Sequence, residues 1–172
     1  MLAYVFFHHP AQGTDVAAYD DGLRRFHASL AEAGSPGFIS SETYHSRDGY
    51  SDWYLVESSA ALDALNDAAV TGRTLPLHDA VAHEAVDFAG KLYKLVTGSP
   101  GGQNFETRFS KPAGMSYRDL YAQLKPWSDR NGVSLWRRMM VLGPPPEFCF
   151  LSPAELDLPP EMSPEVLALK LV

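Results

Sequence analysis

Residues 4–34 read YVFFHHPAQGTDVAAYDDGLRRFHASLAEAG, and residues 105–132 read FETRFSKPAGMSYRDLYAQLKPWSDRNG. Each segment begins with a short run of strand-forming residues, passes through Pro-Ala with a glycine nearby, and continues with apolar residues at helical spacing. Gly34 and Gly132 follow the two helical stretches, where glycine commonly ends a helix. The chain therefore contains the same strand-helix opening twice, which indicates an internal duplication.

The duplication continues beyond these helices. Residues 37–57 (GFISSETYHSRDGYSDWYLVE) align without a gap to residues 132–152 (GVSLWRRMMVLGPPPEFCFLS), and both stretches predict a hairpin of two strands. Each copy ends in a further strand, KLYKLV at residues 91–96 and LALKLV at residues 167–172. A helix is expected before each final strand, and the prolines of DLPPEMSPE shorten it in the second copy.

Each copy thus reads β-α-β-β-α-β, the order of a ferredoxin-like unit with helices on one face of an antiparallel sheet. We predict a first unit in residues 1–98, a Gly/Ser/Pro-rich linker in residues 99–104 and a second unit in residues 105–172. The fold class expected is α+β, with the bare faces of two sheets packed into one pseudo-twofold barrel. Because one chain carries both units, we expect the barrel to close within it, as a monomer or as a homodimer through outer surfaces.

In its element order, and in openings such as FFHHPAQG and RFSKPAG, the chain resembles the dimeric α/β-barrel superfamily, which includes the antibiotic-biosynthesis-type monooxygenases. The resemblance covers nearly the whole chain. It implies a barrel that binds a small molecule, and it suggests a cofactor-independent, monooxygenase-like enzyme for a small aromatic or polyketide-like substrate. A non-catalytic ligand-binding protein and a haem-binding barrel are the alternatives.

Net charge, apolar runs and cysteine count argue against several classes of binding partner and site. The 172 residues carry a formal net charge of −7, which argues against nucleic acid and anionic membrane surfaces. No apolar run approaches the length of a membrane span, and the first residues lack the pattern of a signal peptide. The single cysteine, Cys149, excludes an intrachain disulfide and a cysteine-based zinc site. We expect a cytoplasmic protein with a small-molecule ligand.

Residues 134–143 (SLWRRMMVLG) read as one buried strand with two arginines in its middle. Adjacent side chains of a strand point to opposite faces, so one arginine needs a partner inside the protein. The gap-free alignment places Arg137 opposite Glu42, on a face that also carries Tyr44. We predict that Arg137 lies inside the barrel, either paired with Glu42 or Glu106 or binding an acidic or carbonyl group of a ligand.

The first strand supplies candidates for chemistry. Tyr4, Phe6 and His8 share one face, which we align with Glu106 and Arg108 in the second copy. This face is amphipathic and is predicted to line a pocket inside the barrel, whereas the mostly apolar alternate face is assigned to the helices. His8, as a general base, and Tyr4 are therefore catalytic candidates, and Arg108 is a ligand-binding candidate.

Two further residues complete the candidate set. Trp53, beside the first hairpin, is predicted to line the pocket entrance. His78 lies before the last strand of the first copy, the region from which some barrels of the superfamily bind haem, so it is a haem-ligand candidate. His83 is five residues away and on another helix face, which disfavours a two-histidine metal site. The resemblance implies that the iron ligand of a duplicated haem barrel comes from the second copy, which has no histidine here, so we expect no metal and no cofactor.

Overall fold

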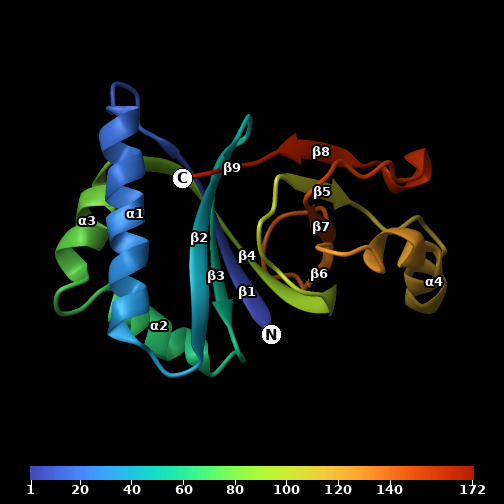
Figure 1. Cartoon of the computed structure of the whole chain (residues 1–172), viewed down its shortest axis with the longest axis horizontal. Helices are drawn as coiled ribbons and strands as arrows, with labels where there is room; N and C mark the ends of the chain where they lie inside the picture. Colours follow the sequence, from blue (N-terminus) through green and yellow to red (C-terminus); the bar gives the residue numbers. More distant parts are fainter.

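The computed structural model describes all 172 residues as a mixed α+β protein with one antiparallel sheet (Figure 1). No helix is both long and apolar enough to cross a bilayer. In chain order the elements are β1 (Leu2–Pro10), α1 (Val16–Ala33), β2 (Phe38–Ser46), β3 (Gly49–Val56), α2 (Ala61–Ala69), α3 (Leu75–His83), β4 (Ala85–Gly98), β5 (Phe105–Phe109), α4 (Tyr117–Ser128), β6 (Ser134–Arg138), β7 (Phe148–Ser152), a 3-10 turn (Pro160–Met162), β8 (Glu165–Ala168) and β9 (Lys170–Leu171).

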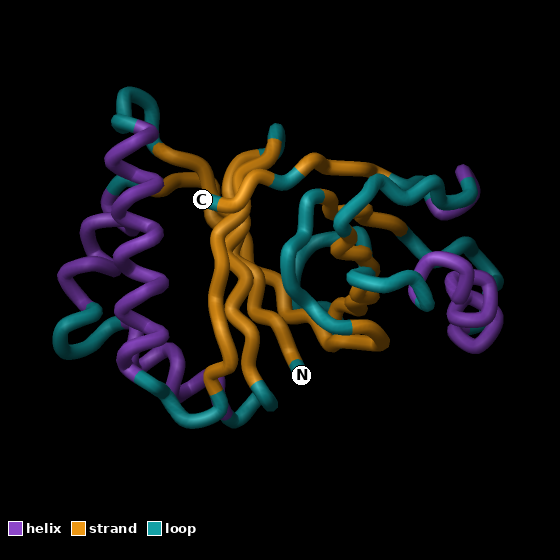
Figure 2. Tube along the Cα trace, viewed as in Figure 1, coloured by secondary structure: helices purple, strands orange, loops and turns teal.

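The strand order confirms the predicted fold class. Across the sheet the order is β8-β5-β7-β6-β4-β1-β3-β2-β9. It contains the ferredoxin-like arrangement twice, as β4-β1-β3-β2 in the first half and as β8-β5-β7-β6 in the second. The halves join where β4 pairs with β6. Helices α1, α2 and α3 cover the first half and α4 covers the second, on opposite sides of the molecule (Figure 2).

The C-terminal segment closes the sheet into a barrel. β8 pairs with β5 at one end of the strand order, and β9 pairs with β2 at the other. Between them, the Leu169 N–H donates to the Asn104 carbonyl at 2.7 Å, and the Val172 N–H donates to the Thr43 carbonyl at 3.0 Å. One segment, interrupted at Leu169, therefore bridges both edges, and the barrel is nearly closed within a single chain, as predicted.

Large aromatic side chains fill the inside of this barrel. The Trp53 ring stacks on Tyr93, with centroids 5.7 Å apart, and meets the Trp136 ring edge-on at 5.6 Å. Each of the three is buried, and the neighbouring strand β1 adds the smaller Ala3 and Val5 to the same cluster, with Phe7 packed against its edge. A barrel packed in this way has little room left for a ligand.

The faces of β1 are therefore the reverse of those predicted. The prediction that Tyr4 and His8 look into the barrel is wrong, because both line a space beneath α1, α2 and α3. Glu106 and Arg108 do face the barrel, so the alignment of these two strand faces is also wrong. The β1 side chains that pack with the tryptophans of β3 and β6 are Ala3, Val5 and Phe7.

A single extra residue explains the error in the hairpins. Phe38 pairs with Val56 and Ser40 with Leu55, so Ile39 is a bulge in β2 that β6 lacks. One residue of offset moves every later side chain to the other face. Arg137 consequently occupies the place of Thr43 on the helix side. The strand also ends at Arg138 rather than at residue 143, because residues 139–143 form a turn.

Arg137 finds an aromatic partner in place of an acid. The prediction that its guanidinium lies inside the barrel beside Glu42 is wrong. Its Nη1 donates to the Tyr121 hydroxyl at 3.2 Å, and its Cζ lies 5.1 Å from the centre of the Tyr117 ring, both on α4. A guanidinium stacked on an aromatic face keeps its charge and buries its flat surface. The neighbouring Arg138 donates to the Gly143 carbonyl at 2.7 Å.

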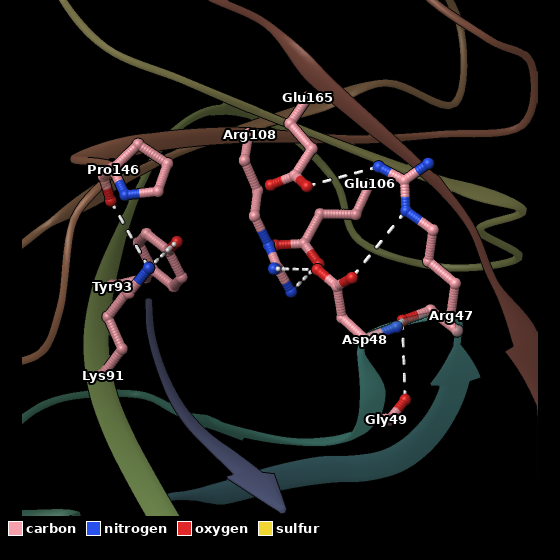
Figure 3. A network of polar contacts seen from close by, with 10 residues as sticks. Arg47, Asp48, Gly49, Lys91, Tyr93, Glu106, Arg108, Pro146 and Glu165 are labelled. Carbon is pink, nitrogen blue, oxygen red and sulfur yellow. Dashed lines mark hydrogen bonds and ion pairs between the residues drawn. The ribbon is translucent and has the colours of Figure 1, made fainter.

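Ion pairs at one end of the barrel hold its two halves together (Figure 3). Arg108 on β5 contacts Glu106 at 3.0 Å and Asp48, in the β2–β3 turn, also at 3.0 Å. Arg47 in the same turn contacts Glu165 on β8 at 3.2 Å. The Glu106 side chain is 1% exposed, so its charge depends on Arg108. The exposed Arg47 pair is expected to contribute much less.

We predict that Arg108→Met destabilises the protein by about 3–5 kcal/mol, because it keeps the apolar stem but leaves Glu106 buried without a partner. Adding Glu106→Gln to the same chain removes the stranded charge and should recover much of the loss. The free energy of unfolding in urea measures both changes. Arg47→Met is the matched control, and it should cost less than about 1 kcal/mol. Equal losses for Arg47→Met and Arg108→Met would contradict this account.

Candidate active site

A cavity of about 630 Å³ lies between the outer face of the first half-sheet and helices α1, α2 and α3. Its walls are mostly aromatic and aliphatic, with contributions from Phe6 on β1, Phe26 on α1 and Phe88 on β4. By contrast, the free space inside the barrel beside Tyr44 and Trp53 is about 10 Å³, too little to hold one water molecule comfortably. The room for a ligand is therefore under the helices.

The corresponding space in the second half is filled. Phe109 stacks between Phe148 and Phe150, with centroid distances of 5.3 and 5.4 Å, and all three are fully buried against Leu120 and Leu124 of α4. The second half has no long final helix, so α4 and the segment that carries Leu156, Leu158 and Met162 cover its sheet. The first half combines three helices with polar side chains on the sheet, and the cavity lies there.

Three polar side chains meet in the wall of the cavity. His8 lies on β1, Asp52 on the adjacent β3 and Tyr19 on α1 above them. The Tyr19 hydroxyl lies 2.7 Å from His8 Nδ1, and His8 Nε2 lies 3.2 Å from Asp52 Oδ2. None of the three is more than 4% exposed. The β1–β3 register places His8 and Asp52 on the same face of the sheet, beneath the apolar stripe of α1 that carries Tyr19.

A second branch reaches Asp52 from the opposite direction. The Thr43 hydroxyl donates to Asp52 Oδ1 at 2.6 Å, and His27 Nε2 lies 2.9 Å from Thr43 Oγ1 and 3.5 Å from Asp52 Oδ1. His27 Nδ1 then lies 2.7 Å from the Ser41 hydroxyl. The Tyr54 hydroxyl adds a bond to Asp52 Oδ2 at 3.3 Å. Both oxygens of the buried Asp52 carboxylate therefore accept hydrogen bonds, Oδ1 from Thr43 and Oδ2 from His8 and Tyr54.

The surroundings determine the charge of each group. Burial alone would raise the pKa of Asp52, but hydrogen bonds and attraction from His27 and His8 outweigh it and hold that pKa well below its usual range. Burial, reinforced by the Asp52 charge, raises the pKa of the Tyr19 hydroxyl well above its usual value. At neutral pH, Asp52 is therefore an ionised acceptor and Tyr19 a neutral phenol.

These charge states fix the direction of the hydrogen bonds. Asp52 has no proton to give, so His8 donates from Nε2, and in the neutral imidazole its Nδ1 accepts from the Tyr19 hydroxyl; this tautomer is assigned from the network. A carboxylate that orients an imidazole, which in turn accepts from a hydroxyl, is an arrangement found in general-base catalysis. The cavity wall can therefore take a proton from a bound molecule.

The structure brings together three of the predicted site residues. Tyr4, His8 and His78 line the cavity. The other five are elsewhere: Glu42, Tyr44, Trp53 and Arg108 face the barrel, where Glu42 accepts a hydrogen bond from the Tyr44 hydroxyl, and Arg137 lies against α4.

Tyr19, His27 and Asp52 were missing from the predicted site. A signal for each is nevertheless present in the sequence. Tyr19 and His27 interrupt the apolar stripe of α1 with polar atoms, and Asp52 is a carboxylate within the otherwise apolar strand YSDWYLV. A polar group on a buried face requires a partner. What the sequence did not provide was the pairing of these three with one another.

Comparison with known proteins agrees with this architecture. No protein-family model and no curated protein matches the chain. Among solved structures, one assigned as a chlorite dismutase superimposes with a TM-score of 0.60 at 14% identity, covering 99% of this chain and 94% of that one. An anthrone oxidase-like protein superimposes with a TM-score of 0.56 at 10% identity, covering 99% and 91%. These similarities concern the fold, an α/β barrel built from two ferredoxin-like units in one chain.

We predict that Asp52→Asn lowers the free energy of unfolding at pH 7 by about 3–5 kcal/mol, because the variant removes the charge that the two histidines surround. The pKa of Asp52 is lower in the folded than in the unfolded chain, so its stabilisation is complete above the unfolded value of about 3.9 and is lost as the pH falls through the folded value. The difference between wild type and variant should therefore shrink between about pH 5 and pH 2.

Chemical denaturation at a series of pH values measures this difference. Asp63→Asn is the matched control, because Asp63 also borders the cavity but is exposed to solvent. It should change stability by no more than about 0.5 kcal/mol at any pH. A gap between wild type and Asp52→Asn that stays constant down to pH 2 would show that the Asp52 charge does not stabilise the fold.

Proposed function

We propose that the protein is a cofactor-independent enzyme that removes a proton from a small, neutral, polyketide-like aromatic molecule and oxidises it with O₂. The observation that carries this proposal is the Tyr19–His8–Asp52 chain in the wall of an aromatic-lined cavity. A buried base with an orienting carboxylate, placed beside a half-open apolar cavity, is the combination expected of an active site.

The first step is proton transfer. An activated C–H of the substrate gives its proton to the Tyr19 hydroxyl oxygen, while the Tyr19 proton passes to His8 Nδ1 over 2.7 Å. His8 then holds protons on both ring nitrogens, and the Asp52 charge stabilises the imidazolium. Tyr19 is neutral before and after the transfer, which fits a phenol whose pKa is raised by burial.

The second step uses O₂ as the oxidant. The substrate carbanion forms a bond to O₂ and becomes a peroxide. The second proton on the same carbon moves to the distal peroxide oxygen as the O–O bond breaks, which leaves a carbonyl group and expels hydroxide; the hydroxide then takes the proton from His8 and becomes water. The balance is one CH₂ group and one O₂ converted into one C=O group and one water, with the base returned to its starting state.

The charge of the cavity favours a neutral substrate. Two carboxylates, Asp52 and Asp63, border it, and no lysine or arginine does. An anionic ligand would have no cation to pair with and would be repelled. Planar aromatic rings match the walls supplied by Tyr4, Phe6 and Tyr54. The likeness in fold to an anthrone oxidase-like protein supports a substrate of this class.

Haem is a poorer fit to the same cavity. Both ring nitrogens of His8 are engaged, by Tyr19 and Asp52, so His8 has none for iron. His78 lines the cavity and has one nitrogen against Asp79 at 3.0 Å, which leaves its Nε2 as the candidate ligand. The lining offers no cation for the two haem carboxylates, and the second half has neither a histidine nor the space. We therefore derive no step through haem.

We predict that His8→Gln slows the oxidation of anthrone by O₂ by about 10²–10⁴-fold, because glutamine fills the site but cannot act as a general base. Oxygen consumption and the absorbance of the quinone product measure the rate. His78→Gln, at the same cavity but outside the proton-transfer chain, is the control and should stay within about twofold of wild type. Tight binding of anthrone without turnover by wild type would favour the non-catalytic ligand-binding protein instead.

We further predict that the purified protein gives no saturable Soret shift when it is titrated with haem, because the cavity lacks the cations that haem carboxylates need. The absorbance spectrum during the titration tests this. A saturable shift that disappears in His78→Ala but persists in His8→Gln would overturn the expectation and establish His78 as an iron ligand.

A further inference from the structure

We propose that His27 is a positioning residue that, acting through Thr43 and Asp52, holds His8 in the tautomer able to accept a proton. His27 does not line the cavity. It lies on α1, two turns beyond Tyr19, and is 8% exposed. The catalytic consequence of this inference rests on the proposed function, but the His8 tautomer can be measured without any substrate.

The direction of each bond in this branch follows from the one before it. Thr43 has one hydroxyl proton, and it is given to Asp52 Oδ1 at 2.6 Å, since an ionised carboxylate can only accept. The Thr43 oxygen must then accept from His27 Nε2, 2.9 Å away. His27 Nδ1 is left without a proton, so it accepts from the Ser41 hydroxyl at 2.7 Å. All donors of the branch point toward Asp52.

The fixed orientation of the Asp52 carboxylate in turn determines which nitrogen of His8 carries the proton. With Oδ1 held by Thr43, Oδ2 faces His8 Nε2 at 3.2 Å and the Tyr54 hydroxyl at 3.3 Å. His8 must therefore carry its proton on Nε2, and its bare Nδ1 faces Tyr19. Six side chains from two branches converge on one buried charge, and with both imidazoles neutral only one arrangement of their protons satisfies every bond.

The tautomer decides whether the site can act as a base. If His8 carried its proton on Nδ1, it would donate to the Tyr19 oxygen, and the Tyr19 proton would point into the cavity. The pair would then offer a proton to the ligand rather than accept one. Without the His27 donor, the Thr43 oxygen loses its partner, its hold on Oδ1 weakens, and the carboxylate can rotate away from His8.

The groups around the branch leave Asp52 as its only negative charge. From β3, Tyr54 stacks on the His27 ring at 5.1 Å, and from β1 and α1 the facing groups are His8 and Tyr19. The carboxylate of Asp20 is engaged by the Tyr50 hydroxyl at 2.7 Å, and Glu84 by the Thr14 hydroxyl at 2.8 Å. Asp52 is therefore the carboxylate toward which the His27 branch of hydrogen bonds is oriented.

Imidazole ¹⁵N NMR of the full chain tests the inference directly, because ring nitrogens with and without a proton have distinct shifts. Wild type should show His8 protonated on Nε2. His27→Leu should move the His8 tautomer ratio by about tenfold toward Nδ1, the effect of losing one hydrogen bond. His27→Gln should keep the wild-type ratio, because glutamine can place an N–H where His27 Nε2 lies. An unchanged ratio in folded His27→Leu would overturn the proposal.

A second pair of variants acts at the next position of the branch. Thr43→Val removes the hydroxyl at nearly constant volume, and Thr43→Ser keeps it. The proposal requires the tautomer to shift in the valine variant and to stay in the serine variant, which also serves if His27→Leu does not fold. The same ratio in both Thr43 variants would contradict it.

Kinetics with anthrone then separates this inference from the proposed function. His27→Leu should lower kcat by about tenfold to a hundredfold with little change in KM and with an altered pH–rate profile, and His27→Gln should restore kcat. Equal losses in both variants would mean that the imidazole itself is needed, which would overturn a positioning role. If wild type does not oxidise anthrone although the tautomer responds as expected, the proposed function fails and the role of His27 in orienting His8 stands.

Discussion

The closure of the sheet is the constraint on which the rest of the molecule depends. β8 and β9 are one segment that must pair with β5 and β2 at the same time, so together they fill one position and the diameter of the barrel is fixed by eight strand positions. At that diameter Trp53, Tyr93 and Trp136 fill the interior. Space for a ligand can then exist only outside the barrel, between the sheet and its helices, which is where the cavity lies.

The two halves have the same topology but different contents. Asp52 pairs with Phe6 and Phe148 pairs with Phe109, so Asp52 and Phe148 occupy equivalent places. In the second half, Phe148 is part of a stack of phenylalanines under α4. In the first half, Asp52 is an ionised carboxylate between two histidines. The second half therefore contributes packing and barrel closure, and the first accepts the cost of burying a charge in return for a reactive cavity wall.

Much of the fold could be predicted from the sequence, and less of the site. Element order, both hairpins and the shortened final helix follow from apolar periodicity and from the positions of glycine and proline. The faces do not, because Ile39 adds one residue to β2 without any mark in its residue type, and this single offset sent Arg137 to the wrong side. His8 and Tyr4 were identified as polar groups on a strand face, yet their partners Tyr19, Asp52 and His27 come from other elements, and only the folded register brings them together.

The asymmetry between the halves also determines stoichiometry. A barrel assembled from two identical chains presents every site twice, related by its axis, and ligands at the two sites can influence each other's affinity. Here the second copy of the site is occupied by Phe109, Phe148 and Phe150, so one barrel has one cavity of this kind. Binding to a single barrel is then a one-to-one equilibrium with a hyperbolic isotherm, and any cooperativity would require contact between separate molecules.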